Sequence, residues 1–218
     1  MSGNIDLILC SRPPFCCYSQ DRGMLVGARS DHSQQLSCCK PDFLDFNFHK
    51  PNFRKHLDAV KRFQPKYAIA PDLFTPEQLP EVLGQAEQLA QYAEQVIIVP
   101  KFSGAIRQIP ECYIIALSVP IKYGDCGNIL MVEFFGRKVH LLGGSPHYQY
   151  KLWRHLPGAD IVSIDGNAYM LSANYGDFWD ADKCGWNRTL RGKGVDRGEL
   201  IKMSVANVVR FWKERLGA

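Results

Sequence analysis

The sequence has no apolar run long enough to span a membrane, and its N-terminus does not resemble a secretory signal. These absences predict a cytoplasmic protein without a membrane partner. The chain also lacks a G-x-G-x-x-G dinucleotide-binding fingerprint, an internal repeat and a low-complexity tract. Its 218 residues suffice for one sizeable core but not for two comfortable domains. We therefore expect a single barrel domain over residues 1–218.

Cysteine spacings typical of metal sites are missing as well. The eight cysteines include two vicinal pairs, Cys16-Cys17 and Cys38-Cys39, but no C-x-x-C and no pair near a histidine at zinc-finger spacing. Reduced thiols are expected, and no cofactor or metal is predicted. A zinc site assembled from distant loops stays open as the alternative. The net charge of +4 permits a nucleic-acid or phosphate partner without requiring one.

The sequence does contain short apolar runs that alternate with amphipathic or turn-rich segments. This rhythm is typical of an α/β fold with parallel strands. Eight strands favour a (β/α)8 TIM-like barrel, complete, trimmed or irregular. The predicted strands are residues 5–10, 24–28, 43–46, 67–70, 95–100, 113–118, 138–142 and 160–164; the predicted helices are 52–63, 76–93, 146–155 and 198–216, while 128–135 fits either structure.

Polar residues follow four of the predicted strands at the point where each strand ends. Each could be an ordinary turn or helix cap, because Asp, Asn, Gly and Ser are common there. In a parallel barrel, however, the residues just after the strands line one face, and catalytic groups collect on it. A glycine pair before a helix can also bring backbone N–H groups close to a phosphate. The residues are Asp45 and Asn47 in "FLDFNF", Asp72 in "YAIAPD", Gly143, Gly144 and Ser145 in "LLGGSP", and Asp165 and Asn167 in "SIDGN".

The order of these segments resembles that in the queuine/archaeosine-type guanine transglycosylases. That family has a G-x-G-[ST]-P phosphate-binding turn, then a G-x-D-x-[FM]-D strand with the nucleophilic aspartate and, in archaeal members, an A-Y-A-L-Y-A-like helix. Here "GGSP", "GAD", "SID" and "AYMLSA" stand in the same order, and "FLDFNF" takes the place of the D-S-G-G-F turn of the general base. The resemblance covers residues 43–179 and is greatest toward short phage and archaeal-virus relatives, some of which put 7-deazaguanines into DNA.

The sequence departs from that family at three points. Phe46 and Asn47 replace small residues of the general-base turn, and Asp165 lies two residues beyond a strict match to the nucleophile. The C-x-C-x-x-C…H zinc motif and the appended RNA-binding domain of the tRNA enzymes are missing. The resemblance thus implies an enzyme without a cofactor whose partner is DNA in preference to tRNA.

The resemblance implies exchange of guanine for a 7-deazaguanine base through a covalent aspartyl-sugar intermediate. It makes Asp165 the nucleophile and Asp45 the general acid and base. Asp72 is then expected to bind the base, and residues 116–125 take the place of a base-binding loop. Gly143, Gly144 and Ser145 are expected at a flanking phosphate, with Asn47 and Asn167 as further substrate-binding residues.

The segment 180–197 is predicted to be a basic loop, followed by a C-terminal helix over 198–216. Arg188, Arg191 and Lys193 could follow a nucleic-acid backbone, or the loop could simply be solvated. Two other functions stay open. One is a non-catalytic nucleic-acid-binding protein; the other is a metal-dependent hydrolase or nuclease with the ligands Asp45, His49, Asp72, His147 and Asp165.

Overall fold

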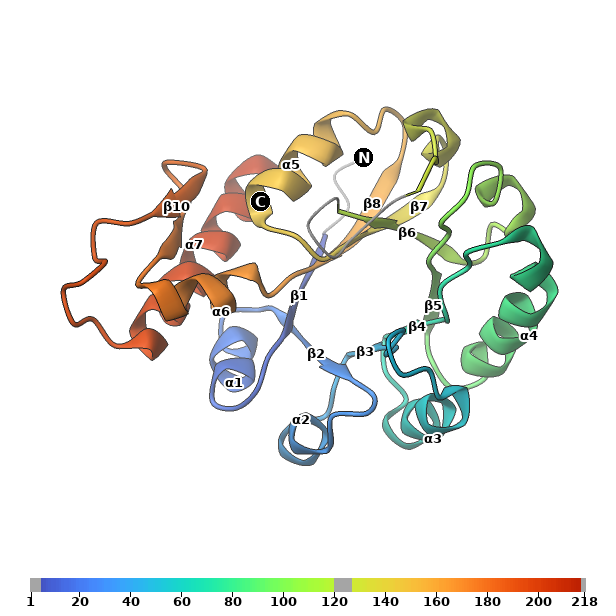
Figure 1. Cartoon of the computed structure of the whole chain (residues 1–218), viewed down its shortest axis with the longest axis horizontal. Helices are drawn as coiled ribbons and strands as arrows, with labels where there is room; N and C mark the ends of the chain where they lie inside the picture. Colours follow the sequence, from blue (N-terminus) through green and yellow to red (C-terminus); the bar gives the residue numbers. More distant parts are fainter. Residues whose placement is uncertain (1–4, 120–126, 217–218) are drawn as a thin grey trace.

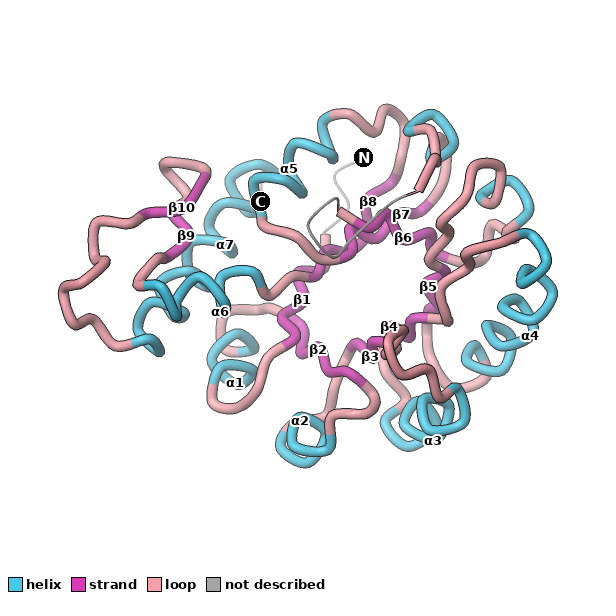
Figure 2. Tube along the Cα trace, viewed as in Figure 1, coloured by secondary structure: helices cyan, strands magenta, loops and turns pink. Residues whose placement is uncertain are grey.

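A closed barrel of eight parallel strands forms the centre of the computed structural model, which describes residues 5–119 and 127–216. Each strand pairs with the next one in sequence, and β8 returns to β1, where Ile8 lies opposite Asp165. Figure 2 shows the strands as a ring with the helices outside it. The strands are β1 (Asp6–Cys10), β2 (Leu25–Arg29), β3 (Phe43–Asp45), β4 (Tyr67–Ile69), β5 (Gln95–Ile98), β6 (Ile114–Ser118), β7 (Lys138–Leu142) and β8 (Asp160–Asp165).

Helices follow most of the strands and pack around the ring (Figure 1). In the described parts of the chain, only the 3-10 turns η2 (Ile106–Gln108) and η3 (Met131–Phe134) follow β5 and β6. The fold is therefore α/β and consistent with a TIM-like barrel. The helices are α1 (Phe15–Gln20), α2 (Ser33–Cys38), α3 (Phe53–Phe63), α4 (Leu79–Ala90, after the 3-10 turn η1, Pro76–Gln78), α5 (Pro146–Arg154), α6 (Ala168–Ser172, continued by the 3-10 turn η4, Ala173–Tyr175) and α7 (Arg197–Leu216).

Two apolar clusters hold the barrel together, because successive residues of a strand point to opposite sides. In β1, Ile8 belongs to the inner cluster, whereas Leu9 packs in the outer cluster between strands and helices. Ile97 and Ile98 divide in the same way in β5. The inner cluster consists of Ile8, Phe43, Phe46, Tyr67, Ile69, Ile97, Val99, Ile114 and Ala116.

The segment 180–197 is not entirely a loop, contrary to the prediction. A two-stranded antiparallel sheet, β9 (Phe178–Asp180) and β10 (Gly185–Asn187), lies beside the barrel, and α7 already begins at Arg197 (Figure 1). The sheet is fixed because the ring of Trp179 is fully buried, with its centroid 4.8 Å from that of Phe211 in α7. The backbone N–H of Trp179 also donates to Ser204 Oγ of α7 at 2.9 Å. None of the helices in the described part of the chain is long and apolar enough to cross a membrane.

Candidate active site

A cavity of about 580 Å³ opens at the carboxyl ends of the strands. Its volume falls in the range typical of small-molecule sites, which is about 300–1,000 Å³. Seven consecutive strands, β2 to β8, each contribute to its lining a residue that lies at the carboxyl end of the strand or within three residues after it. These residues are Arg29, Asp45, Asp72, Lys101, Ser118, Gly143 and Asp165. The structure thus brings together Asp45, Asp72 and Asp165, which are remote in sequence.

Asp165, the last residue of β8, is held in place through one carboxylate oxygen. Its Oδ1 accepts a hydrogen bond from the backbone N–H of Gly143 at 2.7 Å and lies 3.2 Å from His140 Nε2. His140 Nδ1 in turn lies 2.8 Å from Ser163 Oγ. In the tautomer with the proton on Nε2, the buried His140 donates to Asp165 and accepts from Ser163. The thiol of Cys10 donates to the other oxygen, Oδ2, with 4.0 Å between Sγ and Oδ2.

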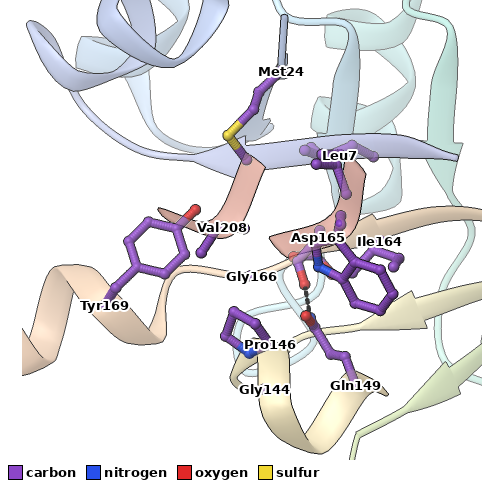
Figure 3. Close-up of a pocket in the computed structure, with 12 residues that line it drawn as sticks. Leu7, Met24, Gly144, Pro146, Gln149, Ile164, Asp165, Gly166, Tyr169 and Val208 are labelled. Atoms are coloured by element: carbon purple, nitrogen blue, oxygen red, sulfur yellow. Dashed lines mark hydrogen bonds between the residues drawn. The ribbon is translucent and has the colours of Figure 1, made fainter. Parts of the chain in front are cut away.

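Gln149 of α5 fixes the backbone around Asp165. Its Nε2 donates to the carbonyl of Asp165 at 2.6 Å and to that of Gly143 at 2.8 Å. Figure 3 shows the Gln149 side chain directed at this backbone, with Tyr169 on the far side of a second cavity. That second cavity has a volume of about 10 Å³, which is roughly the space of one water molecule. It therefore belongs to the support of Asp165 and is too small for a substrate.

Asp45, the last residue of β3, holds its proton near neutral pH. Burial, followed by the negative charges of Asp165 and Asp72, raises its pKa to about 8. A hydrogen bond from the Phe46 backbone and the charge of Arg29 oppose these effects only in part. An acid with this pKa can donate a proton and take one back near pH 7.

Asp72 and Lys101 form an ion pair across the cavity wall, with 3.7 Å between Lys101 Nζ and Asp72 Oδ2. They are neighbours because the pairing of β4 with β5 continues beyond both strands, through a bridge between Leu73 and Pro100. Lys101 Nζ also donates to Ser118 Oγ at 2.7 Å. Burial raises the pKa of Asp72, and the nearby Lys101 opposes that rise.

The other predicted substrate-binding residues have mixed placements. Asn47 and Asn167 line the cavity, but Asn47 uses its amide internally, donating to Asp31 at 2.7 Å and accepting from two backbone N–H groups. The N–H of Gly143, expected at a phosphate, donates to Asp165. Gly144 and Ser145 do not line the cavity. Of the expected base-binding segment 116–125, residues 120–125 lie outside the described residues.

The aromatic residues near these segments divide between cavity and core. Phe46 and Phe48 line the cavity, whereas Tyr169 and Trp179 are buried elsewhere.

The ligand set of the rival metal-dependent hydrolase is not assembled in the described parts of the chain. His147 lies outside the cavity lining, where it contacts Ser145 Oγ and packs against Tyr148. Among the described residues, only Cys16, Cys17 and Cys39 bring three potential ligand atoms within 4.8 Å of one another.

The predicted nucleic-acid-binding residues lie between β10 and α7, away from the cavity lining. Arg191 pairs with Asp177 through Nε at 2.9 Å and Nη2 at 2.7 Å, and Arg188 lies 3.8 Å from the same carboxylate. Lys193 is exposed. Arg191 therefore supports the local structure, while Arg188 and Lys193 are exposed to solvent.

Sequence reasoning missed several residues of the site, namely Arg29, Lys101, His140 and Gln149, whereas Ser118, which lines the cavity, lies in the expected base-binding segment 116–125. Arg29 and Lys101 carried the same signal as the predicted acids, a polar residue where a strand ends. His140 could have been noticed as a polar residue within the apolar strand "KVHLL". Gln149 gave no signal, since a glutamine in a helix is usually solvated.

Comparison with known proteins places the chain in a family without assigning it an activity. No curated protein matches it. The family match begins within α1 and ends near the end of α7. It therefore includes every described residue that lines the cavity of Asp45, Asp72 and Asp165, called the acidic cavity below. With residues 19–213 matched, the chain belongs to the family described as a family of unknown function (DUF6610).

Proposed function

We propose that the protein is a nucleic-acid base-exchange enzyme that replaces guanine by a 7-deazaguanine through an aspartyl-sugar intermediate. The observation that carries the proposal is the pairing of two unlike carboxyl groups in one cavity. Asp45 keeps a proton near neutrality, whereas Asp165 presents a carboxylate oriented by hydrogen-bond donors. Enzymes that break glycosidic bonds with retention use such a pair, one group as acid and base and the other as nucleophile.

In the first step, Asp165 attacks C1′ of the target nucleotide while the bond from C1′ to the base nitrogen breaks. Oδ2 is the attacking oxygen, because Oδ1 is engaged by Gly143 and His140. Asp45 gives its proton to the departing guanine, which leaves as the neutral base. In the second step, Asp45 takes a proton from the incoming 7-deazaguanine, whose nitrogen attacks C1′ and releases the Asp165 carboxylate.

Base selection is assigned to Asp72. Its carboxylate can accept hydrogen bonds from the N–H groups of a guanine-like edge, which an adenine-like edge does not present in the same pattern. Lys101, whose ammonium lies 3.7 Å from Asp72, favours the charged form of that carboxyl group and so opposes the rise in its pKa that burial causes. The half-exposed Phe48 at the rim and Phe46 beside it offer rings on which an extruded base can stack.

DNA is the proposed polymer in preference to tRNA, with Arg188 and Lys193 as contacts to the phosphate backbone. We also propose that the fold is an irregular (β/α)8 barrel in which the turns η2 and η3 stand where helices would follow β5 and β6.

Release of labelled guanine tests the proposal. DNA and tRNA carrying radiolabelled guanine are incubated with the protein and a set of 7-deazaguanine bases, and soluble label is counted. We expect release from DNA by the wild type, a loss of at least 100-fold in Asp165→Asn, and a loss of about 10²–10⁴-fold in Asp45→Asn, the usual effect of removing an acid-base group. Asp160→Asn is the matched control, because Asp160 begins the same strand and is exposed.

A covalent adduct between protein and DNA, stable in denaturing gels, should form with wild type and not with Asp165→Asn. Release from neither polymer with any base supplied would refute the enzymatic proposal. DNA binding without turnover would then favour the non-catalytic alternative, and turnover abolished by a chelator would favour a metal-dependent hydrolase.

A further inference from the structure

Three cysteine thiols converge on the outside of the barrel, away from the acidic cavity. Cys16 and Cys17 lie in α1, and Cys39 directly follows α2. The Sγ atoms are 3.2 Å apart for Cys16 and Cys39, 3.7 Å for Cys17 and Cys39, and 3.9 Å for Cys16 and Cys17. None of the three cysteines lines the cavity.

These separations match those of thiolates around one tetrahedral metal ion. With zinc–sulfur bonds of about 2.3 Å, tetrahedral geometry places the sulfurs about 3.8 Å apart. Two of the three pairs are already within about 0.1 Å of that value, and the third, Cys16 with Cys39, would open by roughly 0.6 Å. A disulfide requires the two sulfurs at about 2.05 Å, so the Cys16–Cys39 pair would have to close by more than 1 Å.

We propose that Cys16, Cys17 and Cys39 form a three-thiolate site for Zn²⁺ that joins α1 to the segment after α2. Soft thiolate ligands select zinc and similar thiophilic cations over Mg²⁺ or Ca²⁺. Three protein ligands leave a fourth position for water or an added ligand, and the exposed side chain of Cys17 places that position at the surface. On binding, each thiol loses its proton to solvent and forms one sulfur–metal bond, so the oxidation state of zinc does not change.

The site is independent of the proposed base exchange, because it shares no residue with the acidic cavity.

Cobalt binding to the reduced, full-length protein tests the site. Co²⁺ is titrated into the chain, and zinc is then added to displace it. We expect one equivalent of Co²⁺ per chain, with thiolate-to-cobalt charge-transfer bands and the intense visible bands of tetrahedral Co²⁺. Cys17→Ser should weaken metal binding at least tenfold and reduce the charge-transfer intensity by about one third, since one of three sulfurs is lost.

Cys112→Ser is the matched control, because Cys112 is exposed and outside the cluster. It should bind like the wild type. Cys17 is chosen for its exposure, and circular dichroism of Cys17→Ser confirms that the variant is folded. Absence of tetrahedral cobalt bands in the reduced wild type, or equal affinity in Cys17→Ser and wild type, would overturn the proposal. So would a Cys16–Cys39 disulfide found by non-reducing mass spectrometry in protein that, once reduced, takes up no metal.

Discussion

Replacing Asp45 by asparagine should remove one defined component of the pH dependence of stability. The pKa of Asp45 is about 8 in the folded protein, against an ordinary value of 3.8. Between these values the unfolded chain has released a proton that the folded protein still holds. The contribution of Asp45 to the unfolding free energy must therefore fall as pH rises through this window, and it is fully present only below about pH 4.

The size of the effect follows from that single proton. A difference of one bound proton changes the unfolding free energy by about 1.4 kcal/mol per pH unit. Asp45 alone should thus cost the wild type about 2.7 kcal/mol between pH 5 and pH 7. Asparagine has nearly the same shape and does not ionise, so Asp45→Asn should lose this component of the slope and be more stable than the wild type at pH 7.

Urea unfolding followed by circular dichroism at about pH 5, 6 and 7 measures the slope, and constant m-values show that the unfolded ensemble is comparable. Asp58→Asn is the control, because Asp58 is an exposed acid on α3. Equal slopes in the wild type and in Asp45→Asn would refute the picture of a buried, protonated carboxyl group. Such a result would also remove the acid from the proposed reaction.

Two further changes test how the site is supported. Gln149→Leu removes the donor of the hydrogen bonds to the carbonyls of Asp165 and Gly143. It should therefore lower the unfolding free energy by about 2–4 kcal/mol. An unchanged midpoint of urea unfolding would contradict this role. Gly144→Ala should destabilise more than Gly143→Ala by about 1–3 kcal/mol, because both glycines have positive φ but only a Cβ at Gly144 would lie 2.5 Å from Val119. Equal losses, measured by thermal unfolding, would show that the contact with Val119 is relieved without cost.

The barrel strands could be predicted because a buried parallel strand is a short apolar run in the sequence, and polar or turn-forming segments mark both of its ends. All eight predicted strands are confirmed within two residues at either end. The long helices were predicted for a similar reason, although the first turn of the segment 76–93 is 3-10 and its helix ends at Ala90. "FCCYSQ" and "SQQLSC", which form α1 and α2, were missed because six residues are too few to show a helical repeat.

The convergence of Asp45, Asp72 and Asp165 could be predicted, because the carboxyl ends of all parallel strands lie on the same face of a barrel. The roles of these three acids stay predictions. The contact between His140 and Asp165 could not be predicted. The register of β7 against β8 shifts between Val139 and His140, and this irregularity sets His140 opposite Ser163. A bulge of this kind depends on packing around the barrel and leaves no mark in a single sequence.

The turn "GGSP" lies where the sequence predicted a turn between strand and helix, but the N–H of Gly143, expected at a phosphate, donates to Asp165. Gly143 and Gly144 both have left-handed backbone angles, with φ of 72° and 82°. This turn directs the N–H of Gly143 at Asp165 Oδ1, while the absence of a side chain on Gly144 admits Val119. Because Gln149 then binds both Gly143 and Asp165, the turn after β7 and the carboxylate of β8 behave as one unit. A substitution in this turn should therefore change the orientation of the Asp165 carboxylate more than it changes the binding of a phosphate.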